Sequence, residues 1–118
     1  MKKNFSVVIP VYNEKDNITL LVKEIISSLE SKFIYEIIIV NDFSNDGTDL
    51  VLKSKIFSNC IILKHKKNEG QSKSIRTGIL ASNYENIITI DGDLQNNPKD
   101  IPSLIDRFNN EDFTYDLI

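Results

Sequence analysis

The sequence predicts an α/β fold in which a mostly parallel sheet carries helices on both faces. Apolar runs rich in Ile and Val alternate along the chain with segments of helical spacing. The run 35–40 consists mainly of Ile and Val, which is typical of a strand that is covered on both faces. Four successive strand-then-helix units arrange the strands in parallel and the helices on either side of the sheet.

The individual elements follow in chain order. Residues 5–11 form the first strand, and the helix after it is marked by apolar residues three and four apart, namely Ile18, Leu21, Val22, Ile25, Ile26 and Leu29. The later elements are a strand at 35–40, a helix after the turn 45–48, a strand at 60–63, a helix at 71–82, a strand at 87–90 and a helix with Pro98 in its first turn. Residues 114–118 resemble the opening of a further strand, so we expect a domain truncated at its C-terminus.

Length and composition limit the chain to one domain. With 118 residues, 41% of them hydrophobic, it can bury a real core but has no room for a second one, so we expect residues 1–118 to form a single incomplete domain. The lone Cys60 cannot form an intrachain disulfide, which favours a reducing, cytoplasmic compartment. The apolar N-terminal segment is interrupted too early for a signal peptide, and no run approaches the ~20 apolar residues that span a bilayer.

Charge and residue content exclude several functions. A formal net charge of -3 argues against a nucleic-acid partner. Lys64, Lys66 and Lys67 flank His65, and we favour a solvated loop there over a patch that faces phosphate or lipid. His65 is the only histidine and no nucleophile elbow is present, so a hydrolase triad or a closed zinc site is not expected. The chain also lacks the Gly-rich loop that cradles phosphates.

Polar residues gather where the predicted strands end. In open parallel sheets, ligands bind beyond the carboxyl ends of the strands, so these residues predict a binding edge. They are Pro10, Tyr12, Asn13 and Glu14 after the first strand, Asn41 and Asp42 after the second, Asn68, Glu69 and Gly70 after the third, and Asp91, Gly92, Asp93 and Gln95 after the fourth.

Each group at this edge has a functional and a purely structural interpretation. Asp91, Asp93 and the Gln95 carbonyl can hold Mg²⁺ or Mn²⁺ against phosphate oxygens, or they can form an ordinary Asp-Gly turn. Asp42 can accept from the N–H of a nucleobase, or it can cap the turn into the second helix together with Ser44. Tyr12 and Glu14 can contact a nucleoside and a sugar hydroxyl, or Glu14 can belong to the polar first turn of a helix.

Four motifs in order resemble the family 2 glycosyltransferases of the GT-A fold. They are residues 8–14, residues 36–48, residues 68–70 with Gly78, and residues 91–98. The run Asp91-Gly92-Asp93-Leu94-Gln95, followed shortly by Pro98, is similar to dolichyl-phosphate mannosyltransferases and their bacterial polyprenyl-phosphate relatives. The resemblance implies a Rossmann-like nucleotide-sugar-binding domain of an enzyme.

The resemblance also implies partners and residue roles. The donor is a UDP- or GDP-sugar, and its contacts are Pro10, Tyr12, Asn13, Glu14, Val40, Asp42, Asp91, Gly92 and Asp93. A divalent Mg²⁺ or Mn²⁺ is held by Asp91, Asp93 and Gln95, with Asp93 as the catalytic residue. The acceptor is a polyprenyl (dolichyl or undecaprenyl) phosphate at the cytoplasmic face of a membrane. An anionic phosphate acceptor needs no strong general base, so we expect direct inverting displacement at the anomeric carbon.

The chain departs from the family pattern in places. Asn41 stands where an aspartate is frequent, Phe43 where a glycine is frequent, and Ser74 where a small apolar residue is common. The C-terminal half of the family, which shapes the acceptor side and often supplies membrane-associating helices, is missing. We therefore expect weakened donor binding and little or no turnover by residues 1–118 alone.

Other functions remain open to different degrees. A non-catalytic nucleotide-binding remnant and a transferase acting on a saccharide hydroxyl are the alternatives closest to the resemblance. A response-regulator receiver fits poorly, because its acidic residues follow strands one and three. A dinucleotide-dependent dehydrogenase lacks its glycine fingerprint.

Overall fold

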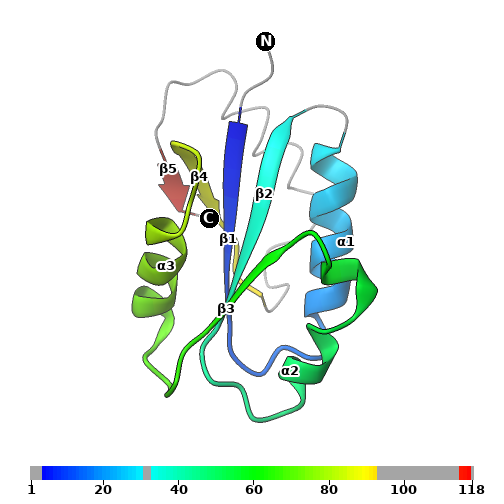
Figure 1. Cartoon of the computed structure of the whole chain (residues 1–118), viewed down its shortest axis with the longest axis vertical. Coiled ribbons are helices and arrows are strands. Elements are labelled where there is room, and N and C mark those ends of the chain that lie inside the picture. The colour runs from blue at the N-terminus through cyan, green and yellow to red at the C-terminus, as the bar shows by residue number, and fades with distance from the viewer. Residues whose placement is uncertain (1–3, 31–32, 93–114, 118) are drawn as a thin grey trace.

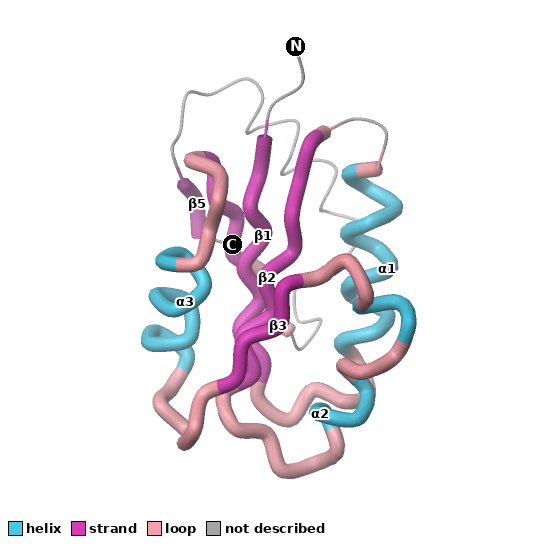
Figure 2. Tube along the Cα trace, viewed as in Figure 1, coloured by secondary structure: helices cyan, strands magenta, loops and turns pink. Residues whose placement is uncertain are grey.

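The computed structural model describes residues 4–30, 33–92 and 115–117, in which a parallel sheet of order β3-β2-β1-β4-β5 is flanked by helices (Figures 1 and 2). In chain order the elements are β1 (Asn4–Val11), α1 (Ile18–Leu29), β2 (Ile34–Asn41), α2 (Thr48–Val51), the 3-10 helix η1 (Lys55–Phe57), β3 (Ile61–Lys64), α3 (Gln71–Leu80), β4 (Asn86–Thr89) and β5 (Tyr115–Leu117). Helices α1 and α2 lie on one side of the sheet and α3 on the other, which confirms the predicted fold class.

Most of the predicted elements lie within a residue or two of their expected bounds. The fifth strand is confirmed, because Ile87 pairs in parallel with Tyr115 and Thr89 with Leu117. The second helix is much shorter than a typical helix. Beyond its C-terminal end, backbone hydrogen bonds between residues three apart, from Lys53 N to Leu50 O and from Ser54 N to Val51 O, form a 3-10-type turn that ends the helix. The predicted helix that begins near Pro98 lies outside the described residues.

Side-chain alternation along β1 and β2 divides the core into two layers. Odd-numbered residues of these strands, such as Val7 and Ile39, pack with the residues of α1. Even-numbered residues, such as Val8 and Val40, form a smaller apolar cluster beneath α3. Because the period of a strand is two, each strand presents one set of residues to each helical layer.

Helix α1 is held by a broad apolar stripe. Five of its residues are buried, namely Ile18, Leu21, Val22, Ile25 and Leu29. Full burial of an aliphatic side chain stabilises a fold by about 1.5–3 kcal/mol, so this stripe is a major part of the core.

Helix α3 approaches the sheet through small residues. Ser74 and Gly78 are its buried positions. A Cβ atom added at Gly78 would lie 2.3 Å from Val8 Cγ1, so only glycine lets the helix backbone lie this close to β1.

Two expectations from composition can be compared with the structure. No helix among the described residues is long and apolar enough to cross a membrane. Cys60 is a free, partly buried cysteine, and burial raises the pKa of its thiol to about 11. A thiol with so high a pKa carries little of the reactive thiolate near neutral pH.

A candidate ligand site at the carboxyl edge of the sheet

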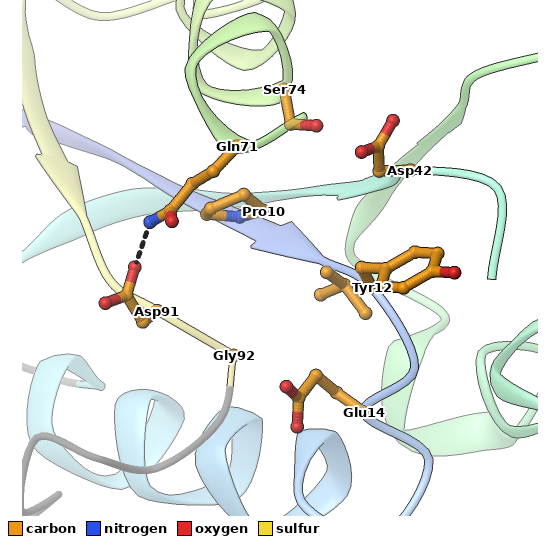
Figure 3. Close-up of a pocket in the computed structure, with 9 residues that line it drawn as sticks. Pro10, Tyr12, Glu14, Asp42, Gln71, Ser74, Asp91 and Gly92 are labelled. Atoms are coloured by element: carbon orange, nitrogen blue, oxygen red, sulfur yellow. Dashed lines mark hydrogen bonds between the residues drawn. The ribbon is translucent and has the colours of Figure 1, made fainter. Parts of the chain in front are cut away.

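A pocket of about 220 Å³ opens where β1, β2 and β4 end beside the first turn of α3 (Figure 3). The strand order makes these three carboxyl ends neighbours, as expected for the ligand-binding edge of an open parallel sheet. The pocket is lined by Pro10, Val11, Tyr12, Glu14, Asp42, Gln71, Ser74, Asp91 and Gly92.

The structure brings most of the predicted site residues together. Those that line the pocket are Pro10, Tyr12, Glu14, Asp42, Asp91 and Gly92. The side chain of Val40 is fully buried in the core beneath α3, and Asn13 uses its side-chain oxygen to accept from Asn45 N at 2.8 Å. Asp93 and Gln95 lie outside the described residues.

Asp42 is the most constrained polar group at the pocket. Its side chain is 4% exposed, Oδ1 accepts from Glu69 N at 2.8 Å and lies 2.8 Å from His65 Nδ1, and Oδ2 accepts from Gly70 N at 2.8 Å. Burial is the largest single influence on its pKa and raises it, but the hydrogen bonds with His65 and with the backbone of Glu69 and Gly70 together outweigh burial and lower the pKa. Asp42 is therefore an ionised acceptor at neutral pH.

The capping role considered for Asp42 belongs to its neighbour. Asn41 Oδ1 accepts from Ser44 N at 3.1 Å and from Ser44 Oγ at 2.7 Å, while Asn41 Nδ2 donates to Asp49 of α2. The alternation of the strand explains the division, because position 41 continues the odd set that faces α1 and α2, whereas position 42 continues the even set that faces α3. Of the two interpretations considered for Asp42, the structure therefore does not show the one in which it caps the turn into α2 together with Ser44.

The expected solvated loop around His65 is only partly correct. Lys66 and Lys67 are exposed, and Lys64 forms an exposed ion pair with Asp49. His65 instead is 8% exposed, because its ring turns inward between β2 and α3. No motif in the sequence marked this histidine, although its place directly after the third strand was a positional signal.

The loops after β1 and β2 support each other. Asn13 N donates to Ser44 Oγ at 2.9 Å, and Glu14 N donates to Thr48 Oγ1 at 3.2 Å. Asn13 and Phe43 adopt left-handed backbone conformations with φ of 56° and 62°. Asparagine tolerates this region, whereas Phe43 is strained there, which explains physically why glycine suits that position.

Glu14 combines a structural contact at the start of α1 with a place in the pocket lining. Its backbone oxygen accepts from Asn17 N and Ile18 N at the start of α1, at 3.1 and 3.0 Å. Its carboxylate also lines the pocket, below the 45% exposed ring of Tyr12 in Figure 3. The residue therefore fixes the entry into α1 while its carboxylate lies at the pocket.

Three pocket residues were not predicted as part of the site, namely the apolar Val11 at the end of β1 and the polar Gln71 and Ser74 of α3. Gln71, in the first turn of α3, donates from Nε2 to Asp91 Oδ1 at 2.6 Å (Figure 3). Ser74, one turn later, donates to Gly70 O at 2.9 Å. The signal that could have found the two α3 residues is position, because the motif 68–70 precedes them directly and the first turn of a helix after a strand faces the binding edge.

Oxygen donors for a divalent cation are present, but only in part. Glu14 and Asp91 present carboxylates, the hard ligands that Mg²⁺ and Mn²⁺ prefer. Within residues 4–30, 33–92 and 115–117, no three His, Cys, Asp or Glu side chains are grouped as a metal site. The donor chemistry fits a divalent cation, and the two other predicted ligands are those outside the described ranges.

Comparison with known proteins gives consistent matches. The sequence model of the family described as Glycosyl transferase family 2 matches residues 6–117. The undecaprenyl-phosphate 4-deoxy-4-formamido-L-arabinose transferase of Edwardsiella ictaluri is 36% identical over 117 residues, covering 96% of this chain and 35% of that protein. The chain thus spans about a third of the length of such curated relatives.

Solved structures share the fold. The complex of S. aureus TarS 1-349 with UDP matches with a TM-score of 0.64 at 26% identity, over 92% of this chain and 33% of that one. The glucosyl-3-phosphoglycerate synthase of Mycobacterium tuberculosis matches with a TM-score of 0.69 at 22% identity, over 87% of this chain and 38% of that one.

Proposed function

This chain belongs to glycosyl transferase family 2, and on that basis we propose that it binds the nucleotide of a UDP- or GDP-sugar for transfer of the sugar to a polyprenyl phosphate. The observation that carries the proposal is the pocket at the carboxyl edge, where a buried ionised carboxylate, an exposed aromatic ring and two further carboxylates converge. The 26% identical solved structure with UDP supports a nucleotide ligand.

The nucleoside lies over Pro10 and Tyr12 and is read by Asp42. Uracil and guanine both present ring N–H donors, and an ionised, acceptor-only carboxylate suits them. Tyr12, with its ring 45% exposed at the pocket, offers a stacking surface. Glu14 and Asp91 accept from ribose hydroxyls. Val40 and Asn13 do not line the pocket, so we assign them no direct contact with the nucleoside.

The diphosphate requires positive charge that a Gly-rich loop does not supply here. Asp91, Asp93 and Gln95 are the residues we assign to hold Mg²⁺ or Mn²⁺, with Asp93 in the catalytic role. Such a cation neutralises charge on the departing nucleoside diphosphate. Gln71 orients Asp91 through the 2.6 Å hydrogen bond from its Nε2 to Asp91 Oδ1.

The acceptor is a polyprenyl phosphate, as the name of the 36% identical transferase suggests. Its phosphate oxygen attacks the anomeric carbon as the bond from that carbon to the nucleoside diphosphate breaks, and the configuration inverts. The acceptor is already anionic, so a strong general base is not needed. Since such an acceptor is a membrane lipid, we assign the reaction to the cytoplasmic face of a membrane.

Calorimetric titration of UDP and GDP into the purified chain, with Mn²⁺ and with EDTA, tests the donor site. We expect one nucleotide to bind more tightly, binding to weaken in EDTA, and Asp93→Ala to abolish the effect of the metal. Glu85→Gln is the matched control, because Glu85 is an exposed carboxylate that does not line the pocket.

Two outcomes of this titration contradict the proposal. Metal-independent binding that survives Asp93→Ala would remove the proposed cation site. Absence of binding by either nucleotide would contradict both the proposed donor site and the alternative of a non-catalytic nucleotide-binding remnant.

A further inference from the structure

We propose that His65 is a positioning residue for nucleobase recognition, because it fixes the Asp42 carboxylate in the orientation in which it accepts from a base. The inference rests on the proposed function, since it concerns how the same pocket recognises its nucleotide. It assigns a role to a buried histidine that none of the site motifs includes.

The ring of His65 bridges the second strand and the third helix. His65 Nδ1 lies 2.8 Å from Asp42 Oδ1, and His65 Nε2 lies 2.9 Å from Thr77 Oγ1 on α3. The side chain is 8% exposed. A buried ring with both nitrogen atoms paired cannot rotate away without leaving polar groups unsatisfied, which costs about 1–3 kcal/mol for each group. The ring is therefore a rigid donor rather than a mobile one.

The charge of Asp42 determines which atom carries the proton of the hydrogen bond between Asp42 and His65. Asp42 is ionised, and an ionised carboxylate only accepts hydrogen bonds, so the proton between these residues belongs to His65. Glu69 also faces Nδ1, with Oε2 at 3.7 Å, and it likewise offers an acceptor. His65 thus donates from Nδ1 to Asp42.

Thr77 preserves this donor in both charge states of the ring. Its hydroxyl lies 2.9 Å from Lys73 O as well as 2.9 Å from His65 Nε2. When the ring is neutral, the hydroxyl donates to Nε2. When the ring is protonated, Nε2–H donates to Thr77 Oγ1 and the hydroxyl donates to Lys73 O. Neither arrangement displaces the Nδ1 proton from Asp42.

The contacts of Asp42 leave room for one ligand donor. Oδ1 is used by His65 and Glu69 N, and Oδ2 is used by Gly70 N. A carboxylate has about four lone-pair sites, so one remains, on Oδ2. The carboxylate lines the pocket, where a uracil or guanine ring N–H can meet that site. Loss of the His65 donor would leave Asp42 Oδ1 with Glu69 N as its one remaining partner, so the carboxylate would be held by two backbone N–H groups alone and its orientation would be less constrained.

Two substitutions separate the two contacts of the ring. His65→Asn has its amide nitrogen near the position of Nδ1, so it keeps a donor for Asp42 and loses Thr77. His65→Gln has its amide nitrogen near the position of Nε2, so it keeps a partner for Thr77 and loses Asp42. The two variants are matched in polarity, and each breaks one contact.

Calorimetry with UDP, GDP and ribose 5-diphosphate gives the decisive comparison. We expect the Kd of His65→Asn for the preferred nucleotide to lie within about threefold of that of the unsubstituted chain. The Kd of His65→Gln should be about tenfold higher or more, because the Asp42 carboxylate that accepts from the base has lost its charge-assisted hydrogen bond from His65. Ribose 5-diphosphate lacks a base, so all three proteins should bind it equally. Equal loss in both variants, or equal loss for the base-free ligand, would overturn the inference.

Nuclear magnetic resonance tests the same inference without a ligand. His65 is the only histidine, so ring ¹⁵N signals need no assignment among several residues. We expect the neutral ring to carry its proton on Nδ1, and Asp42→Asn to shift the tautomer toward Nε2. A neutral ring with its single proton on Nε2 and none on Nδ1 in the unsubstituted chain would refute the positioning role. If no nucleotide binds at all, the proposed function fails and nucleobase recognition fails with it, whereas an Nε2 tautomer with nucleotide binding intact overturns the role of His65 alone.

Discussion

The two faces of the sheet are built in different ways. On one face, α1 packs a continuous stripe of Leu, Ile and Val against β1 and β2, and this cluster contains most of the buried apolar residues among those described. On the other face, α3 covers a small cluster of four buried residues, Val8, Ile38, Val40 and Ile87. The α1 face supplies the stability of the fold, and the α3 face positions the pocket.

The difference arises from the residues that each helix turns toward the sheet. In α3 the buried residues are Ser74 and Gly78, and the exposed Gln71 lines the pocket one turn before Ser74, so these residues are small or polar. Small residues let the helix approach closely, and its polar groups reach Asp91 and the His65 ring. A helix that positions a polar site thus gives up apolar burial, so substitutions on the two faces should have different consequences.

The largest effect is expected on the α1 face. Leu21→Ala removes a side chain that is 1% exposed, and the lost burial plus the resulting cavity should lower the free energy of unfolding by about 2–5 kcal/mol. Leu20→Ala is the matched control on the same helix, since Leu20 is 51% exposed, and it should change stability by less than about 0.5 kcal/mol. Urea denaturation measures both, and similar values for the two variants would contradict this view of the α1 face.

On the α3 face a larger side chain should destabilise the fold, whereas on the α1 face a smaller side chain should do so. Gly78→Ala raises helix propensity by about 1 kcal/mol, but its Cβ would lie 2.3 Å from Val8 Cγ1. Overpacking should win and lower the free energy of unfolding by about 1–3 kcal/mol. The double variant Gly78→Ala with Val8→Ala should lose less than the sum of the single variants, as measured by a double-mutant cycle. Strict additivity would show that α3 moves away from the sheet instead.

The same contrast explains what could be predicted from the sequence. The periodic apolar residues of α1 and the Ile- and Val-rich strands predicted the fold, because the spacing of apolar residues along the chain determines which face of a helix or strand is buried. Pro10, Tyr12, Glu14, Asp42 and Asp91 could be found as well, because strand ends in a parallel sheet share one edge.

Contacts between distant segments could not be predicted. The bond between His65 and Thr77, and the bond between Gln71 and Asp91, depend on how closely α3 docks. That distance depends on Gly78 against Val8, a fact of three-dimensional packing rather than of spacing. The exchange of roles between Asn41 and Asp42 was missed for a simpler reason, since it required knowing which parity of β2 faces which helix.

The contribution of Asp42, on the α3 face, to the free energy of unfolding should depend on pH. In Asp42→Asn the amide nitrogen cannot accept from Gly70 N, so we expect a loss of about 1–2 kcal/mol in unfolding free energy at pH 7. The folded-state pKa of Asp42 is lowered, so its contribution is present above the unfolded value of about 3.9 and disappears as pH falls through the folded pKa.

Thermal unfolding of both proteins between pH 7 and pH 2 measures this contribution. The stabilities of Asp42→Asn and the unsubstituted chain should converge toward the acid end of the range. Glu36, Asp46 and Asp49 also have lowered pKa values, but both proteins contain them and their effects cancel in the difference. A stability gap that is constant with pH would show that Asp42 contributes through packing and not through its charge.

The smallest effect is expected in the loop that joins β2 to α2, between the two faces. Phe43 has φ of 62° and is 47% exposed, and Lys64 Nζ lies 6.0 Å from the centre of its ring. A non-glycine residue in this region costs about 1 kcal/mol or more, whereas an exposed cation–π contact contributes about 0.5–1 kcal/mol. Phe43→Gly should therefore raise the free energy of unfolding by up to about 0.5 kcal/mol.

Phe43→Ala is the control variant. It keeps the backbone strain and loses the ring, so its free energy of unfolding should be lower than that of the unsubstituted chain. Because the two variants remove the same ring, their difference in urea denaturation isolates the strain, and equal stabilities would mean that the left-handed conformation of Phe43 carries no measurable cost.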